Sequence, residues 1–225
     1  MKRLFVRNKM IGVLILGLAL AGCVTNPSPP TYFYMMEPLV PPVEEPSAAM
    51  EKKQTVIAIS TVRIPSYLDR NQIVTRLKAT EYGLGEFDQW AEPVDDNLTR
   101  VIAQNLSRLL ADDAADIFPA AKEVPYDYRI GVEVIRLDGK LDDQATLIAQ
   151  WAIFGDDEEE MIVLRKFEHR EKIEAEIKKR KSKPQGTAPT YERDNYTGLV
   201  MAQSRAIEKL SRDIAAAVKV ILNSQ

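Results

Sequence analysis

Three segments with the two-residue period of β-strands follow one another between residues 128 and 169, separated only by short turns. Side chains that recur at every second position lie on one face of a strand. The alternating sets are Tyr128, Ile130, Val132 and Val134, then Ala145, Leu147, Ala149, Trp151 and Ile153, then Met161, Val163, Phe167 and His169. Asp138-Gly139-Lys140 and Gly155-Asp156-Asp157 supply turn residues, so the sequence predicts an antiparallel meander.

Two helices are predicted on either side of this meander. The segment 94–111 carries apolar residues at spacings of three and four, and Asp95 or Asp96 is suited to capping its start. The segment 195–222 has the same spacing over a longer range, as far as Ile221. Each helix therefore presents one apolar stripe, which we expect to pack on a sheet.

Further strands are predicted upstream. The apolar runs 32–36 and 55–64 are typical of strands, and shorter strands are expected at 72–77 and 81–85 within the long stretch 66–93. The resulting fold class is α+β, with a single mainly antiparallel β-sheet and two main helices packed on one side. We expect one domain spanning residues 32–225.

The N-terminus reads as a lipoprotein signal peptide, residues 1–22. A basic start is followed by an apolar segment, and as a helix residues 10–22 would reach only about 20 Å, short of the roughly 30 Å hydrocarbon core. The segment ends in Leu20-Ala21-Gly22-Cys23, which resembles a lipobox. Cys23 would carry diacylglycerol as a thioether and an N-acyl chain such as palmitate. The alternative is an ordinary secretory signal that ends near a cysteine.

Residues 23–31 are predicted to be a lipidated tether. Proline is frequent here, and the eight residues 24–31 would span about 25 Å at ~3.1 Å per residue. Two or three acyl chains exceed what stable anchoring requires. Val24 follows the cysteine at a position where lipoproteins kept on the inner membrane usually carry Asp, so we expect the periplasmic face of the outer membrane.

The composition excludes several classes of function. Loss of four basic residues with the signal peptide moves the formal charge from −3 to −7, so nucleic acid is a poor partner. Cys23 is the only cysteine and His169 the only histidine, which excludes disulfides, thiol zinc clusters and His-based triads. Without a Gly-rich phosphate loop, the sequence predicts no catalytic site, no metal site, no cofactor other than the lipid, and no enzyme activity.

A signature segment links the chain to a known family. Residues 64–76 read IPSYLDRNQIVTR and residues 86–93 read EFDQWAEP. Together with NLTRV at 97–101 and MAQSRA at 201–206, they resemble the ABC-type transport auxiliary lipoproteins, the paraquat-inducible protein C (PqiC) family. The resemblance covers nearly all of the mature chain. A charged insertion at 171–189 departs from the typical member.

The resemblance implies a role in lipid transport and membrane integrity. Such a protein would be a non-enzymatic lipoprotein subunit that docks a mammalian-cell-entry (MCE) protein, the substrate conduit of an ABC-type transporter, at the outer membrane. A tubular conduit as partner favours a ring-shaped homo-oligomer. A second hypothesis is a lipoprotein scaffold or activator of peptidoglycan assembly, although a short tether fits that role poorly.

Eight residues of the signature segment are candidates for an interaction surface: Tyr67, Leu68, Asp69, Arg70, Gln72, Arg76, Trp90 and Glu92. Aromatic and arginine side chains are enriched at such surfaces. In the alternative interpretation they lock the segment onto the core, with Asp69 or Glu92 paired to Arg70 or Arg76 and Trp90 packed inward. The basic run 178–183 and the acidic hairpin tip 156–160 are expected to be solvated loops.

Overall fold

The computed structural model describes residues 29–41, 54–119, 125–156, 160–174 and 195–224. Within the chain, Thr31–Gln225 form one compact unit. The predicted signal peptide, Cys23, most of the tether and the basic run 178–183 lie outside the described residues, so these remain predictions. None of the helices in the described part is both long and apolar enough to span a bilayer.

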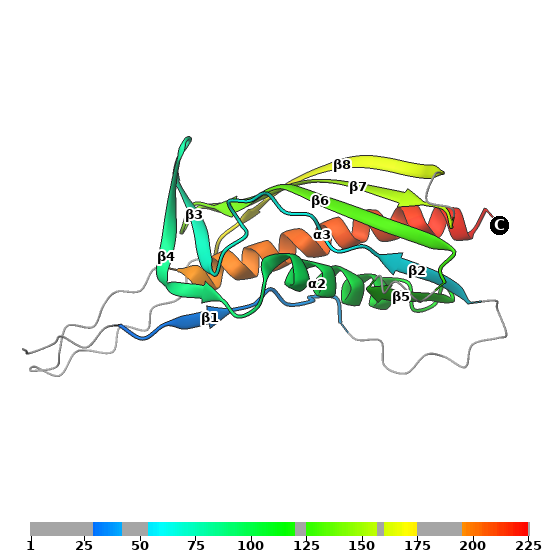
Figure 1. Cartoon of the computed structure of the whole chain (residues 1–225), viewed down its shortest axis with the longest axis horizontal. Coiled ribbons are helices and arrows are strands. Elements are labelled where there is room, and N and C mark those ends of the chain that lie inside the picture. Colours follow the sequence, from blue (N-terminus) through cyan, green and yellow to red (C-terminus); the bar gives the residue numbers. More distant parts are fainter. Residues whose placement is uncertain (1–28, 42–53, 120–124, 157–159, 175–194, 225) are drawn as a thin grey trace, which may run out of the picture. The chain divides into compact units, whose positions relative to one another are not determined.

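A five-stranded sheet forms the main layer (Figure 1). Its strand order is β5 (Ala115–Pro119), β2 (Thr55–Ile59), β6 (Tyr128–Gly139), β7 (Gln144–Phe154) and β8 (Met161–Lys172). The pairs β6–β7 and β7–β8 are antiparallel, with Val132 opposite Trp151 and Trp151 opposite Arg165. The predicted meander is therefore confirmed. Because β8 runs to Lys172, the first two residues assigned to the charged insertion belong to a strand.

A second, three-stranded sheet shows that the prediction of a single mainly antiparallel sheet is wrong. It has the order β1 (Tyr32–Tyr34), β4 (Glu81–Trp90) and β3 (Gln72–Lys78), with β1 parallel to β4. In the larger sheet, β2 is parallel to both β5 and β6. Both sheets are mixed because strands far apart in sequence pair in parallel, and side-chain alternation carries no information on strand direction.

The boundaries of several strands also differ from the prediction. The predicted strand 55–64 ends at Ile59, and the predicted strand 81–85 continues to Trp90. Strand β5 was not predicted; it is only five residues long and ends at Pro119. Gly139 ends β6 rather than forming the turn, which lies at 140–143 with Asp142 at a φ of 58°. A Cβ at Gly139 would lie 2.6 Å from the side chain of Leu199, so this glycine allows the C-terminal helix to approach the end of β6.

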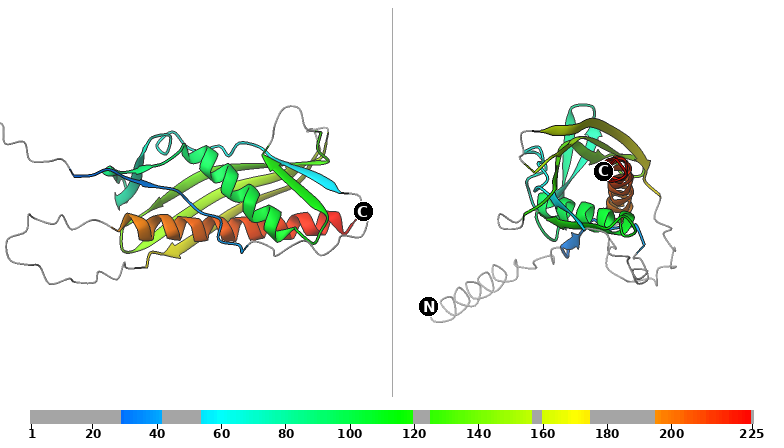
Figure 2. Two further views of the ribbon diagram at one scale, coloured as in Figure 1. Left: turned by 90° about the horizontal axis from the view of Figure 1, so that it is seen from below. Right: turned by 90° about the vertical axis from the view of Figure 1, so that its right-hand side faces the viewer.

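Two helices, α2 (Val94–Leu109) and α3 (Tyr196–Leu222), lie on the same side of the five-stranded sheet (Figure 2). The predicted positions of both helices are confirmed. Asp95 and Asp96 lie in the first turn of α2, where they complement the helix dipole, but the N-cap residue is Pro93 and no side chain caps that end. At α3 the side chain of Asn195 accepts a hydrogen bond from the backbone N–H of Gly198 at 2.9 Å.

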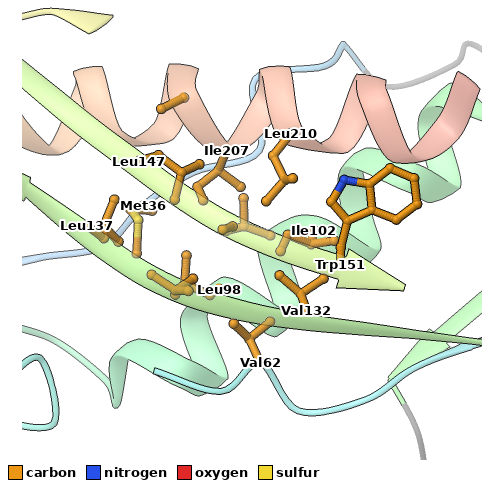
Figure 3. Packing of buried hydrophobic residues seen from close by; sticks show 14 of the residues in the cluster. Met36, Val62, Leu98, Ile102, Val132, Leu137, Leu147, Trp151, Ile207 and Leu210 are labelled. Carbon is orange, nitrogen blue, oxygen red and sulfur yellow. The ribbon is translucent and has the colours of Figure 1, made fainter. Parts of the chain in front are cut away.

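The core lies between the helices and the sheet. In Figure 3, Leu147 and Trp151 of β7 point toward Ile207 and Leu210 of α3, all fully buried or nearly so. The indole N–H of Trp151 donates to Asp213 at 3.0 Å, which satisfies its polar atom. This packing fixes the long helix along the meander.

The segment after β1 forms a strap, residues 35–40, across the two helices. Its Met36 is fully buried, and the backbone N–H and C=O of that residue bond to the Asn97 side chain at 2.9 and 3.2 Å. The backbone N–H of Glu37 donates to Ser204 of α3 at 3.2 Å, and Arg108 donates to the carbonyl of Pro38 at 3.3 Å. These bonds tie the start of the compact unit to the helices.

Candidate functional site

The signature segment lies mainly in the β3–β4 hairpin and the loops on either side of it. This hairpin stands at one end of the five-stranded sheet (Figure 1). Strand β3 carries Gln72 and Arg76, while β4 ends on Trp90, one residue before the loop to α2. The structure therefore gathers the candidate residues around one hairpin.

A buried carboxylate joins the hairpin to the large sheet. The side chain of Asp138, in β6, is completely buried and receives a bidentate pair of bonds from Arg76 of β3, at 3.0 and 2.7 Å. Arg136, two residues earlier in β6, also donates to it, at 2.8 Å. Hydrogen bonding to Asp138 raises the pKa of Arg76. Two cations thus share one carboxylate at the junction of the two sheets.

Two tyrosines cover this ion cluster. The Tyr67 hydroxyl accepts a hydrogen bond from the backbone N–H of Leu137 at 3.2 Å, and the ring packs against Tyr82 with centroids 5.3 Å apart. The Arg76 guanidinium lies over the Tyr82 ring, 4.5 Å from its centroid, and also bonds its hydroxyl. Burial raises the pKa of Tyr67 to about 12, so the phenol stays neutral at physiological pH. Tyr67 and Arg76 therefore hold the hairpin in place.

Three other candidates pack or pair within the fold. Leu68 and Trp90 are buried in the core, as the interpretation with Trp90 packed inward predicted. Glu92 accepts hydrogen bonds from Asn97 and Arg100 of α2, at 2.8 and 2.7 Å. The predicted ion pairs are wrong, because Arg76 binds Asp138 and Glu92 binds Arg100. Asp138 was missed because its Asp-Gly sequence resembled a turn.

The remaining candidates lie at the surface. Asp69 and Arg70 are exposed, and Gln72 is half-buried. The hairpin also exposes Leu77, Tyr82 and Leu84, of which Leu77 and Leu84 are each 50% exposed. That these residues form an interaction surface remains a prediction.

Outside this hairpin, the described residues include a second cluster of ionisable side chains, around the single histidine. No three His, Cys, Asp or Glu side chains of the described ranges are grouped so that they could hold a metal ion. The single histidine, His169, lies in β8 as predicted and contacts Glu171 at 2.9 Å, while Glu171 also pairs with Arg205 of α3 at 2.9 Å. This second ion cluster connects the edge strand to the closing helix.

The region that includes the hairpin matches a known protein family. Residues 38–215, which include the whole signature segment, all of α2 and most of α3, match the model of the ABC-type transport auxiliary lipoprotein component. The chain belongs to this family.

Two relatives with the same name match this chain. This chain is 24% identical over 143 residues to the intermembrane transport lipoprotein PqiC of Escherichia coli, a match that covers 63% of this chain and 72% of the relative. The PqiC protein of Shigella flexneri matches to the same extent. The protein is thus a homologue of PqiC, as the signature segment indicated.

Solved structures share the fold. One crystal structure of an uncharacterized protein, 16% identical, matches with a TM-score of 0.61 over 84% of this chain and 99% of the other. A crystal structure from Xanthomonas campestris, 14% identical, matches with a TM-score of 0.55 over 80% of this chain and 92% of the other. At these identities the likeness concerns the fold alone.

Asp138 gives this auxiliary lipoprotein a specific acid sensitivity. Burial opposes its ionisation, but hydrogen bonds from Arg76 and Arg136 prevail and hold the pKa of Asp138 below its ordinary value. A carboxylate shifted this way stabilises the fold above its unfolded pKa of about 3.9, and the contribution is lost as pH falls through the lower folded value. We expect the urea midpoint to fall below about pH 4 more steeply in the natural protein than in Asp138→Asn.

Circular dichroism during urea titrations at a series of pH values measures this difference. Burial opposes the ionisation of Glu171 as well, but hydrogen bonds from His169 and Arg205 lower its pKa. Because Glu171 is present in both proteins, its effect cancels in the comparison. Equal acid dependence of the two proteins would show that Asp138 does not titrate as described.

Proposed function

We propose that this protein is a non-enzymatic lipoprotein subunit of an MCE-type ABC lipid transport system. It is held by lipid on Cys23 at the periplasmic face of the outer membrane, where it docks the MCE conduit. The observation that carries the proposal is the match of residues 38–215 to the auxiliary lipoprotein family. The name of the PqiC relatives, which describes intermembrane transport, supports the same role.

The β3–β4 hairpin supplies the most suitable docking surface. Its inner side is fixed to β6 through Arg76 and Asp138, so the hairpin is a rigid projection. The leucines Leu77 and Leu84 remain half exposed on it, and Lys78, next to Leu77, forms an exposed ion pair with Glu81 at 2.8 Å. Apolar side chains next to charged ones match the arrangement of an interface core and its rim. In this proposal, one part of the signature segment has a structural role and another part forms the interaction surface.

Affinity capture of the intact lipoprotein from envelope extracts, after mild crosslinking, tests the proposal. We expect an MCE protein to be recovered with the natural chain. Leu84→Asp should lower that recovery at least about tenfold, which corresponds to a loss of roughly 1.4 kcal/mol of binding free energy. Burial of a new carboxylate in the interface provides the physical reason.

Val220→Asp is the matched control, because Val220 is also an exposed aliphatic residue, at 67%, but lies near the end of α3. That variant should capture the MCE protein as well as the natural chain does. Recovery of peptidoglycan synthesis enzymes in place of an MCE protein would favour the scaffold hypothesis. An equal loss of MCE recovery in both variants would show that the hairpin is not the docking surface.

A further inference from the structure

The first strand of the compact unit exposes an uncharged aromatic surface. Residues 31–36 read TYFYMM and carry no charge. Phe33 is 65% exposed, while Tyr32 and Met35 are each 39% exposed. Strand β1 is also the last strand of its sheet, so no other described strand covers its outer edge. Exposed apolar side chains clustered in this way usually mark a contact surface.

The fold holds this strand in one orientation. Tyr34 faces inward, where its ring lies 6.3 Å from that of Tyr196 and its hydroxyl bonds Asp88. Because successive side chains of a strand point to opposite faces, Phe33 must point outward. The strap that follows is anchored by buried Met36 and its bonds to Asn97. The exposure of Phe33 is therefore imposed by the structure.

One residue of α3 extends the surface. Met201 is 40% exposed and precedes Ser204 by three residues. Ser204 binds the backbone of Glu37, and residues three apart lie on the same side of a helix. Met201 therefore lies beside the strap. We call Phe33, Met35 and Met201 the leading surface.

The length of chain before β1 indicates what covers this surface. Tyr32 lies nine positions after Cys23, and a fully extended chain of nine residues spans at most about 32 Å. If Cys23 is lipidated, the leading surface stays that close to the lipid. Phenylalanine is among the side chains that segments lying in the interface bury at the boundary of the head groups and acyl chains.

We propose that the leading surface rests on the phospholipid head groups of the bilayer that carries the Cys23 anchor, with Phe33 inserted most deeply. This proposal rests on the lipidation assumed in the proposed function. The contact sets the orientation of the domain on the membrane. It places the tethered end of the domain, rather than an arbitrary face, against the bilayer.

Phe118 offers a matched comparison. It is an exposed phenylalanine, at 43%, on β5, which is also the last strand of its sheet. Strand β5 follows the C-terminal end of α2, whereas the strap binds Asn97 in the first turn of that helix. The sixteen residues of α2 span about 24 Å. Phe118 should therefore stay in water when Phe33 enters the interface.

The experiment uses the full lipidated chain with Phe33→Cys or Phe118→Cys, labelled with an environment-sensitive dye. Lipidation consumes the thiol of Cys23, the only natural cysteine, so each variant has one free thiol. The protein is reconstituted into vesicles of phosphatidylethanolamine and phosphatidylglycerol, with or without lipids that carry a nitroxide on the head group. We expect severalfold greater quenching at position 33 than at position 118.

Flotation of the same samples separates the two proposals. Protein that does not float with the vesicles contradicts the lipid anchor itself. Protein that floats but shows equal quenching at both positions overturns the leading surface and leaves the anchor intact. Protection of position 33 from both the lipid quencher and a water-soluble quencher would assign the surface to a protein contact, and it would also overturn the proposal.

Discussion

Replacing Cys23 with Ser is expected to release the whole protein from the membrane while leaving it folded. Serine lacks the thiol that forms the thioether, so no acyl chain is attached. Each buried methylene of such a chain contributes about 0.8 kcal/mol, and the loss of two or three chains is therefore decisive. The compact unit begins at Thr31, so the folded core does not include Cys23. Membrane fractionation and complementation of envelope integrity measure the result.

Val24→Asp provides the companion variant for this experiment. It keeps the thiol and the lipid, and we expect it to move the protein from the outer to the inner membrane without making it soluble. Both variants should have the circular dichroism spectrum of the natural protein. Full restoration of envelope integrity by the soluble Cys23→Ser protein would contradict the anchoring part of the proposed function.

Asp138→Ala is expected to lower the free energy of unfolding by roughly 3 kcal/mol. The variant removes the only carboxylate bonded to both Arg76 and Arg136 in the described structure and leaves a cavity beside them. The side chains of Arg76 and Arg136 are 18% and 31% exposed, so water can reach them in part, which places the loss at the low end of the range for buried ion pairs. Urea unfolding measures the loss.

Asp143→Ala is the control, because Asp143 lies five residues away and its side chain forms an exposed ion pair, 3.9 Å from Lys140, while its backbone hydrogen bonds are unchanged by the substitution. Such pairs contribute less than about 1 kcal/mol. Hydrogen exchange shows in addition which strands lose stability. In Asp138→Ala, the amides of β3 and β4 should lose protection before those of β7, because Arg76 joins the hairpin to the large sheet. Equal losses of stability in the two variants would contradict the role of the ion cluster.

The helices and the meander were predictable because their signals are local. In α2 and α3 the apolar residues recur within each turn of a continuous segment, and caps or turns follow directly in sequence. The strands β6, β7 and β8 are consecutive and pair with their neighbours through short connections, so alternation and turn residues sufficed to predict their order.

The two mixed sheets were not predictable from the same signals. Strand β5 pairs with β2 across about sixty residues that contain a hairpin and a helix, as the register of Thr55 with Ala115 shows. Nothing in either segment specifies a partner so distant. The partner is selected by the packing of α2, which returns the chain to the edge of the sheet, and that is a property of the whole fold.

The candidate site, like the fold, was predictable from the sequence only in part. The sequence by itself determined both helices and the family, and it predicts the lipobox and the acidic mature chain, since each depends on residue type or on short spacing. Only the tertiary structure decided that Arg76 binds Asp138, 62 positions away, that Glu92 binds Arg100, and that Leu68 and Trp90 are buried while Asp69 and Arg70 are exposed. An ion pair forms where folding places two charges within a few ångströms in a site shielded from water, and sequence distance does not encode that placement.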